Sequence, residues 1–339
     1  MFSTLIRFYT EGDIYLPNKL NFDMKKQELT YIQQLDIEGL WDLYDVHLPL
    51  NPDVNIIVGE NGTGKSTLLM ILKMIAGLPV DTNQKSFKSK RIKVTWVSAA
   101  LGKQDAYGSI KKDIPKFNLK PTSKNIWDGN SKKNVDILVN YIATFDSSIY
   151  IPNDYDIKNY LFIETHLDKE LFEQLRRYTE YQNRLLKKSE NRGKSLNTIL
   201  KKRDWLFDKL NELFKPTSKR FVESEEDTQP KVILPNGEKL SLFQLSSGEK
   251  QLLLILLTVL CQDEKPTILL LDEPEISLHT HWQYELIEII RKLNPNCQVI
   301  AVTHSSSMFN DGWNNKVIWM ADVLTEENSI SKPINKDKT

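Results

Sequence analysis

Hydrophobic residues in this chain gather in short runs that polar stretches separate, a pattern typical of alternating strands and helices. The continuous apolar runs Val54–Val58, Ile268–Leu271 and Val299–Thr303 predict strands whose two faces are both covered. Thr30–Leu40 and Leu43–Leu50 instead alternate apolar and polar residues, and they predict an antiparallel edge joined to the first buried strand. The sequence therefore predicts an α/β fold with a mixed sheet and flanking helices.

The middle of the chain is less regular. Ile92–Ser98 predicts a strand, and Val135–Phe145 has the apolar character of a strand or a helix. Between them, residues 102–134 are rich in Lys, Asn, Ser and Gly and show little periodicity, so we expect an exposed loop region there.

Two amphipathic helices are predicted next. Within Leu167–Leu186 one helix face recurs at spacings of three and four, formed by Leu167, Leu171, Leu175, Tyr178, Gln182 and Leu185. A similar stripe within Leu196–Leu213 is formed by Leu196, Ile199, Arg203, Leu206, Leu210 and Leu213. Ser189–Lys194 predicts a turn between the two helices. This helical pair could cover the core of the domain, or it could project as an arm that binds a partner. We favour the arm, because the pair lies in a basic part of the chain.

Charge is unevenly distributed along the 339 residues, although the formal net charge is zero. Residues 84–134 carry 13 Lys and Arg against 3 Asp and Glu, and residues 168–220 carry 15 against 8. Three interpretations are open: solvated faces, contact with nucleic acid, or contact with an acidic partner protein. The first is the commonest meaning of such runs.

Composition also bears on the compartment. No apolar run approaches the ~20 residues that a transmembrane helix needs, so we expect no membrane contact. Cys261 and Cys297 each lie in an apolar segment without a partner at metal-ligand spacing. We expect both to be packed thiols in a reducing, cytoplasmic environment.

The stretch VGENGTGKST at Val58–Thr67 carries the clearest chemistry, because it matches the phosphate-binding P-loop pattern. A strand precedes it and a helical run, Thr67–Ile75, follows it, which argues against a chance glycine-rich turn. Lys65 is expected to reach the β- and γ-phosphates, and the Ser66 hydroxyl to ligate Mg²⁺. The predicted nucleotide-binding residues of this loop are Gly59, Asn61, Gly62, Gly64, Lys65, Ser66 and Thr67.

A second motif, LSSGEKQ at Leu245–Gln251, precedes the apolar helical run Leu252–Leu260. Ser and Gly at a helix start can present N–H groups and a hydroxyl to an anion, although the same residues also form a plain N-cap. Because the motif lies between the P-loop and a third motif, we interpret it as part of the nucleotide site. Its predicted binding residues are Ser246, Ser247, Gly248 and Glu249.

The third motif is TILLLDEP, which ends the Ile268–Leu271 strand with two carboxylates. Asp272 is expected to hold Mg²⁺, and Glu273 to orient or deprotonate the attacking water. His304 ends the Val299–Thr303 strand, where an imidazole can contact the γ-phosphate. The predicted catalytic residues are therefore Glu273, His304 and Lys65.

Together these motifs, over about half the chain, resemble Walker A, the signature, Walker B and the switch histidine of ABC-type ATPases. ENGTGKS, LSSGEKQ and DEPEISLH are more similar to the SMC, RecF and OLD-type group than to transporter subunits. Within that group the chain is most similar to stand-alone ATPases of anti-phage defence, of the Septu or PARIS type. The resemblance implies ATP and Mg²⁺ as cofactors, and a homodimer or larger homo-oligomer in which Ser247 and Gly248 act in trans.

The resemblance also sets the functional expectation. It implies a sensor or regulatory ATPase that controls a separate effector, a nuclease or a toxin, so we expect the chain itself to cut no DNA or RNA. The alternatives are an ATPase of DNA repair or chromosome maintenance and a transporter subunit. Gln104 is a candidate for the family's Q-loop glutamine. We expect an ATPase domain formed by 1–134 and 221–339, with an insertion at 135–220 that includes the helical hairpin 167–214.

Overall fold

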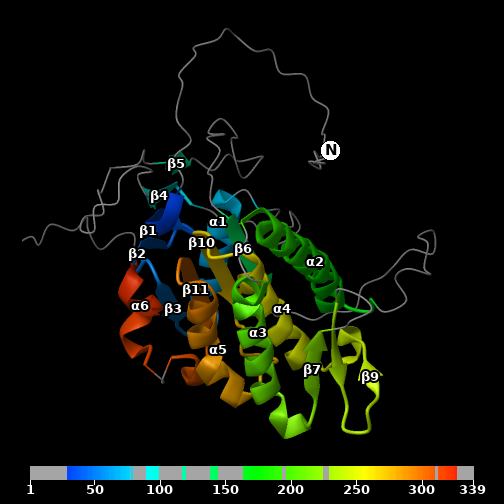
Figure 1. Ribbon diagram of the computed structural model, residues 1–339. Coiled ribbons are helices and arrows are strands. Elements are labelled where there is room, and N and C mark those ends of the chain that lie inside the picture. The colour runs from blue at the N-terminus through cyan, green and yellow to red at the C-terminus, as the bar shows by residue number, and fades with distance from the viewer. Residues whose placement is uncertain are drawn as a thin grey trace, which may run out of the picture.

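The central layer of the molecule is a five-stranded, all-parallel sheet (Figure 1). The computed structural model describes residues 29–76, 78, 89–98, 117–119, 138–143, 163–192, 196–223, 229–309 and 312–326. The strand order is β12 (Val317–Trp319), β3 (Val54–Val58), β11 (Cys297–Thr303), β10 (Thr267–Asp272) and β6 (Leu138–Ala143). All the residues of β3 and β11 are buried, as their apolar runs predict.

A second sheet is wholly antiparallel. Its order is β13 (Leu324–Glu326), β2 (Tyr44–Pro49), β1 (Leu29–Leu40), β4 (Arg91–Ser98) and β5 (Phe117–Leu119). The predicted α/β class is confirmed, but the parallel and antiparallel strands form two packed sheets rather than one mixed sheet. The short strand β5 also lies where we expected only loop, because it gains its hydrogen bonds by pairing with β4.

Residues of the parallel sheet alternate between two hydrophobic cores. Leu269 and Leu271 of β10 face one core, and Ile268 and Leu270 face the other. The first core includes residues of α2 (His166–Arg192), α3 (Leu196–Leu213), α4 (Ser247–Cys261) and α5 (Thr280–Leu293). The second includes residues of α1 (Lys65–Ile75) and of the antiparallel sheet. The parallel sheet is therefore covered on both faces, as Figure 1 shows.

The helical pair, α2 and α3, packs on the body of the protein. The stripe that includes Leu171, Leu175 and Tyr178 is buried in the same core as α4, and Leu206 and Leu210 of α3 are fully buried there. The expectation of a projecting arm is therefore wrong, and the alternative that the pair covers the core is correct. The spacing of apolar residues predicts which face of a helix is buried, but not which surface buries it.

The predicted turn at Ser189–Lys194 is also misplaced, since α2 continues to Arg192. The residues from Ser189 to Arg192 include no Gly or Pro, and Gly193 is the first helix breaker. The helix therefore continues through this polar stretch.

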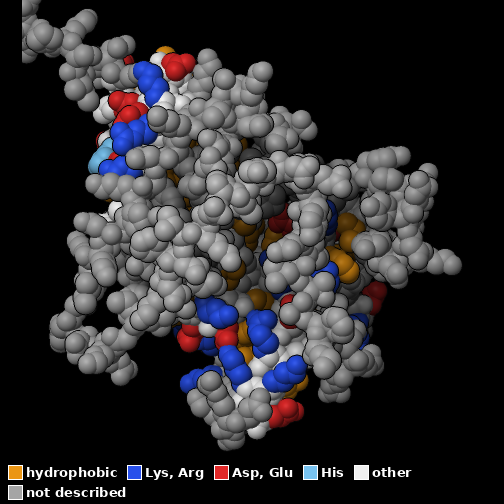
Figure 2. Space-filling view, turned by 90° about the horizontal axis from the view of Figure 1, so that it is seen from above, with side chains coloured by type: hydrophobic (Ala, Val, Ile, Leu, Met, Phe, Trp, Pro, Cys, Tyr) orange, Lys and Arg blue, Asp and Glu red, His pale blue; other side chains and the backbone are white. Residues whose placement is uncertain are grey.

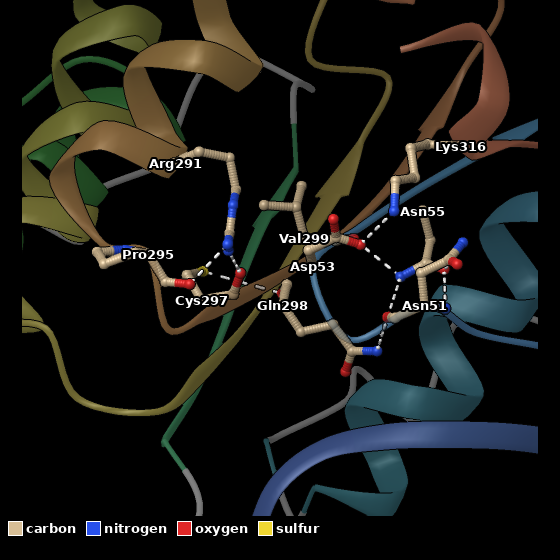
Figure 3. Close-up of polar contacts among 9 residues, drawn as sticks. All are labelled: Asn51, Asp53, Asn55, Arg291, Pro295, Cys297, Gln298, Val299 and Lys316. Carbon is tan, nitrogen blue, oxygen red and sulfur yellow. Dashed lines mark hydrogen bonds and ion pairs between the residues drawn. The ribbon is translucent and has the colours of Figure 1, made fainter. Parts of the chain in front are cut away.

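A buried amide ties the two sheets together. Gln298 of β11 is fully buried, and its side chain accepts from the Ile32 N–H and donates to the Ile32 carbonyl of β1. It also donates to the Asn51 carbonyl at 2.7 Å, an oxygen that Asn55 Nδ2 shares at 2.9 Å (Figure 3). Lys316 forms an ion pair with Asp53 beside this cluster. These bonds fix β3 and β11 at the end opposite the P-loop.

The remaining elements are small. A three-stranded sheet is formed by β7 (Arg220–Glu223), β8 (Pro230–Ile233) and β9 (Lys239–Leu240). Short helical turns are η3 (Lys215–Thr217), η4 (Leu242–Gln244), η5 (Ser306–Met308), η6 (Asn314–Lys316) and α6 (Met320–Val323). Within the described ranges, no helix combines the length and the apolar character that crossing a lipid bilayer requires.

Candidate active site

The P-loop connects β3 to α1, and its lysine is folded inward. Lys65 is only 4% exposed, and its Nζ donates to the carbonyls of Gly59 and Glu60, both at 2.8 Å. Burial lowers the pKa of Lys65, while the nearby carboxylates of Glu273 and Asp272 act in the opposite direction. The ammonium is therefore held at the mouth of the loop by two acceptors that phosphate oxygens can replace.

Helix α1 begins at Lys65, two residues before the predicted start, which places Lys65 and Ser66 in its first turn. Gly64 is the N-cap, with a left-handed φ of 94° that favours glycine. The first turn of a helix presents unpaired N–H groups, so the loop and the helix start together form an anion-binding site.

The Walker B carboxylates, Asp272 and Glu273, lie beside this helix start. Their strand β10 pairs with β11, and β11 pairs with β3, the strand that leads into the P-loop. The Ser66 hydroxyl donates to Asp272 Oδ1 at 3.0 Å, and the Tyr141 hydroxyl donates to Oδ2 at 3.2 Å. Burial raises the pKa of Asp272, and these two hydrogen bonds act to lower it. Burial and the neighbouring Asp272 raise the pKa of Tyr141, so its phenol stays protonated and remains a donor.

These residues fit a Mg²⁺ ion. A carboxylate and a hydroxyl oxygen 3.0 Å apart are hard ligands of the kind that Mg²⁺ prefers, and Mg²⁺ usually takes its other ligands from water and phosphate. In the described part of the chain no group of three His, Cys, Asp or Glu side chains converges to form a complete metal cage. The arrangement therefore suits an ion that arrives with a nucleotide.

Glu273 adopts a strained backbone conformation next to Asp272. Its φ is 49°, a left-handed value that is unfavourable for a residue with a side chain, and its N–H donates to the Val302 carbonyl at 2.8 Å. The Glu273 carboxylate lies 3.3 Å from His304 Nε2. Two of the three predicted catalytic side chains, those directly after β10 and β11, therefore meet at one sheet edge.

Hydrogen bonds to polar side chains hold the His304 segment in place. The His304 N–H donates to Glu275 Oε1 at 2.7 Å. The side chain of Gln283, in α5, donates to the Leu278 carbonyl at 2.9 Å and accepts from the Ser305 hydroxyl at 2.7 Å. The loop after Walker B is thus bonded to the segment after β11 directly through Glu275 and indirectly through Gln283 of α5.

The signature motif opens α4. Ser246 is the N-cap, and it forms a reciprocal capping box with Glu249, whose carboxylate also forms an ion pair with Lys219. These partners give Ser246 and Glu249 a structural role, whereas Ser247 is exposed in the first turn of the helix. Within the described residues, no hydrogen bond or ion pair joins the signature to the P-loop.

Gly248 is the close-contact point of the signature. A Cβ added there would lie 2.1 Å from the Ser277 carbonyl oxygen, so only glycine allows α4 to approach the loop that follows Walker B. Gly248 and Ser277 line a cavity of about 400 Å³. Ile276, which is 56% exposed, and Trp282 also line it. The signature therefore forms one face with the loop after Walker B.

Sequence analysis missed Trp41, which lies in the turn between β1 and β2. Trp41 and Asp42 both have left-handed φ values, 57° and 60°, and a Cβ added to Gly64 would lie 2.6 Å from the tip of the indole. The turn therefore holds an aromatic ring against the N-cap of the P-loop helix. An aromatic residue between two alternating strands was the only available signal, and it does not indicate the P-loop by itself.

The structure adds less about the other predicted site residues. Asn61 is exposed, and Thr67 is half-buried in the first turn of α1. Gly62, with a φ of 83°, has open space where a Cβ would be. Gln104 lies outside the described residues, so its role as Q-loop glutamine stays a prediction.

The basic blocks are described only in part, since most of 84–134 lies outside the described residues. In α2 and α3, Lys188 forms an ion pair with Asp263, Lys202 with Glu264, and Arg203 with Asp204 and Glu223. Figure 2 shows Lys and Arg side chains gathered toward the lower edge of that view, with Asp and Glu among them. These three basic side chains of the helical pair are therefore neutralised by nearby carboxylates.

Comparisons with known proteins identify the family of the chain. Residues 54–309 match the family described as "AAA domain, putative AbiEii toxin, Type IV TA system". The chain is 22% identical to the Septu protein PtuA of Bacillus thuringiensis over 85% of this chain and 75% of that protein. It is 34% identical to the Retron Vc95 probable ATPase of Vibrio cholerae serotype O1 biovar El Tor, over 22% of this chain and 16% of that protein.

One of the solved structures that the chain matches is an Smc head bound to the C-winged helix domain of ScpA. It shares 17% identity with this chain at a TM-score of 0.48, over 85% of this chain and 93% of the other. Because the family match covers more than half of the sequence, the chain belongs to that AAA-domain family. It is an ATPase with a P-loop fold, and the predicted relation to the Septu ATPase is confirmed.

Proposed function

We propose that two copies of this ATPase close head to tail around Mg²⁺–ATP and that the closed dimer regulates a separate effector of an anti-phage defence system. One observation carries the proposal. Lys65, Ser66, Asp272, Glu273 and His304 converge at one sheet edge. The signature packs on the loop after Walker B through Gly248, and no hydrogen bond or ion pair among the described residues joins it to the P-loop. A nucleotide at the P-loop then obtains its signature contacts from a second copy.

The residues of the P-loop side have distinct roles. Lys65 leaves the carbonyls of Gly59 and Glu60 and contacts the β- and γ-phosphates, and the N–H groups of the first turn of α1 bind the same anion. Ser66 and Asp272 hold Mg²⁺, which neutralises charge on the phosphates. Trp41 offers an aromatic face beside Gly64 against which the nucleobase packs.

Hydrolysis needs a positioned water. Glu273 accepts a hydrogen bond from that water and orients it toward the γ-phosphate, and the His304 imidazole contacts the phosphate oxygens. The exposed Ser247 and the N–H groups at the start of α4 complete the site from the second copy. ATP therefore favours the closed dimer, and hydrolysis removes this preference.

The link to defence rests on relatives. The similarity to Septu PtuA extends over 85% of this chain. The similarity to the retron probable ATPase extends over 22% of it. We infer that a partner protein supplies the toxic or nucleolytic step and that the ATP cycle restrains or releases it. The described thiols, buried Cys297 and half-buried Cys261, form no disulfide, in keeping with the proposed reducing cytoplasm.

The test is a phage challenge of cells that carry this gene together with its native neighbours. We expect protection in the wild type and its loss in Lys65→Ala and Glu273→Gln, measured as efficiency of plating. Lys239→Ala, at an exposed lysine of β9, is the matched control and should protect fully. Full protection by Lys65→Ala would contradict an ATP-dependent role in defence.

A further inference from the structure

Tyr141 stands outside every motif that the sequence analysis identified, yet its hydroxyl contacts the Walker B carboxylate. The Ser66 hydroxyl donates to one oxygen of Asp272 and the Tyr141 hydroxyl to the other. We propose that Tyr141 is a positioning residue that orients Asp272 for Mg²⁺. The proposal rests on the Mg²⁺–ATP site proposed above and adds a residue to it.

The fold brings Tyr141 to Asp272 through strand register. β6 pairs with β10 in parallel, with Ala143 opposite Asp272 and Tyr141 opposite Leu270. Tyr141 is thus two residues before the end of its strand, and the length of a tyrosine side chain spans the difference. A shorter polar residue at this position would not reach the carboxylate.

The ring is held by the P-loop helix as well. Lys73 Nζ lies 4.3 Å from the centroid of the Tyr141 ring, a cation–π contact, and Lys73 is in the last turn of α1. The first turn of the same helix carries Ser66. One helix therefore supplies a hydroxyl to one oxygen of Asp272 and supports the ring whose hydroxyl reaches the other.

Two hydrogen-bond donors restrict rotation of the Asp272 carboxylate more than a single donor does. The terminal torsion of an aspartate side chain is broad, so a single hydrogen bond leaves the plane of the carboxylate free to turn. With a donor on each oxygen, the plane is fixed before the metal arrives. Removing the hydrogen-bond partners of metal ligands typically lowers metal affinity by about 10- to 100-fold.

Tyr141→Phe tests the idea, because it keeps the ring and its contact with Lys73 and removes only the hydroxyl. The matched control is Tyr178→Phe, which removes the hydroxyl of a fully buried tyrosine elsewhere, one whose oxygen accepts from Gln182 at 3.0 Å in α2. Both variants and the wild-type chain are purified, and their melting temperatures are compared to verify folding.

The main readout is binding rather than turnover. A fluorescent ATP analogue is bound first in EDTA and then during a Mg²⁺ titration, and Mn²⁺ binding is followed by electron paramagnetic resonance. We expect the same affinity for the analogue in EDTA for all three proteins. The metal concentration for half-saturation should rise about tenfold for Tyr141→Phe only.

The outcomes separate this proposal from the proposed function. If the wild-type chain binds no nucleotide, or binds it without any response to Mg²⁺, the Mg²⁺–ATP site itself is wrong. If the wild type responds to Mg²⁺ and Tyr141→Phe has the same half-saturation, Tyr141 does not position Asp272. An equal shift in both variants would also overturn the proposal, since it would reflect a general loss of stability.

Discussion

Replacing Gly248 by alanine probes the contact between the signature and the loop after Walker B. The added Cβ would lie 2.1 Å from the Ser277 carbonyl oxygen and 3.2 Å from the Ser277 carbonyl carbon, and both neighbours are backbone atoms. Ordinary contacts begin at 3.4 Å, so the start of α4 and the Ser277 loop must separate by more than an ångström. No side-chain rotation can relieve this overlap.

The magnitude follows from two opposing effects. Overpacking of this kind costs about 1–3 kcal/mol, while alanine is favoured over glycine in a helix by about 1 kcal/mol. We therefore expect the free energy of unfolding to fall by no more than about 2 kcal/mol. The rate of ATP turnover should fall by about 100-fold, because a misplacement of about 1 Å in a catalytic site can have that effect.

Three measurements check this prediction: urea unfolding without nucleotide, steady-state ATP hydrolysis, and binding of a fluorescent ATP analogue. Binding to the P-loop should stay within about twofold of wild type, since Lys65 and Ser66 are not involved. Gly237→Ala is the control, because it strains a residue with a φ of 85° whose surroundings are open. Wild-type turnover in Gly248→Ala, or an equal loss in Gly237→Ala, would refute the reasoning.

Two further variants test other parts of the site. Ser305→Ala removes the hydroxyl that donates to Gln283 and should lower kcat about three- to tenfold at an unchanged KM for ATP, because the His304 segment loses one anchor; an unchanged kcat in a rate assay would exclude this role. Reversing the exposed Lys187 and Lys201 to glutamate should weaken any binding to DNA and reduce its salt slope by about 1 to 2, as fluorescence anisotropy would measure. An unchanged affinity and slope would assign these lysines to a solvated face.

Much of the active site could be predicted from the sequence, because its residues directly follow buried strands. The carboxyl ends of parallel strands meet at one sheet edge, so a P-loop after β3, two acids ending β10 and a histidine ending β11 must lie together. The 3.0 Å contact of Ser66 with Asp272 and the 3.3 Å contact of Glu273 with His304 agree with that expectation.

Residues whose role depends on register or turn geometry could not be predicted. Tyr141 contacts Asp272 only because β6 pairs with β10 in one particular register, and a single sequence does not reveal that pairing. Trp41 reaches Gly64 only through two consecutive left-handed residues in a tight turn. Both were visible as aromatic residues, but nothing in their local pattern distinguishes them from core residues.

The helical pair shows a different limit. Its apolar stripes correctly predicted two helices, but a stripe of leucines can face either the protein's own core or a partner. Leu171 and Leu210 are buried beside α4, which shows that the stripes face the protein's own core. The basic character of the segment was misleading, because Asp263 and Glu264, far along the chain, neutralise two of its lysines.

The central claim is that ATP joins two copies of this chain, and Glu273→Gln tests it most directly. The amide keeps the shape of the side chain and leaves Asp272 to hold Mg²⁺, but it cannot activate water, so the closed state should accumulate. Sizing chromatography with light scattering at micromolar protein should give a dimer with Mg²⁺–ATP and a monomer without it, and Lys65→Ala should stay monomeric in both. A Glu273→Gln protein that remains monomeric while its bound nucleotide is demonstrated would contradict the account.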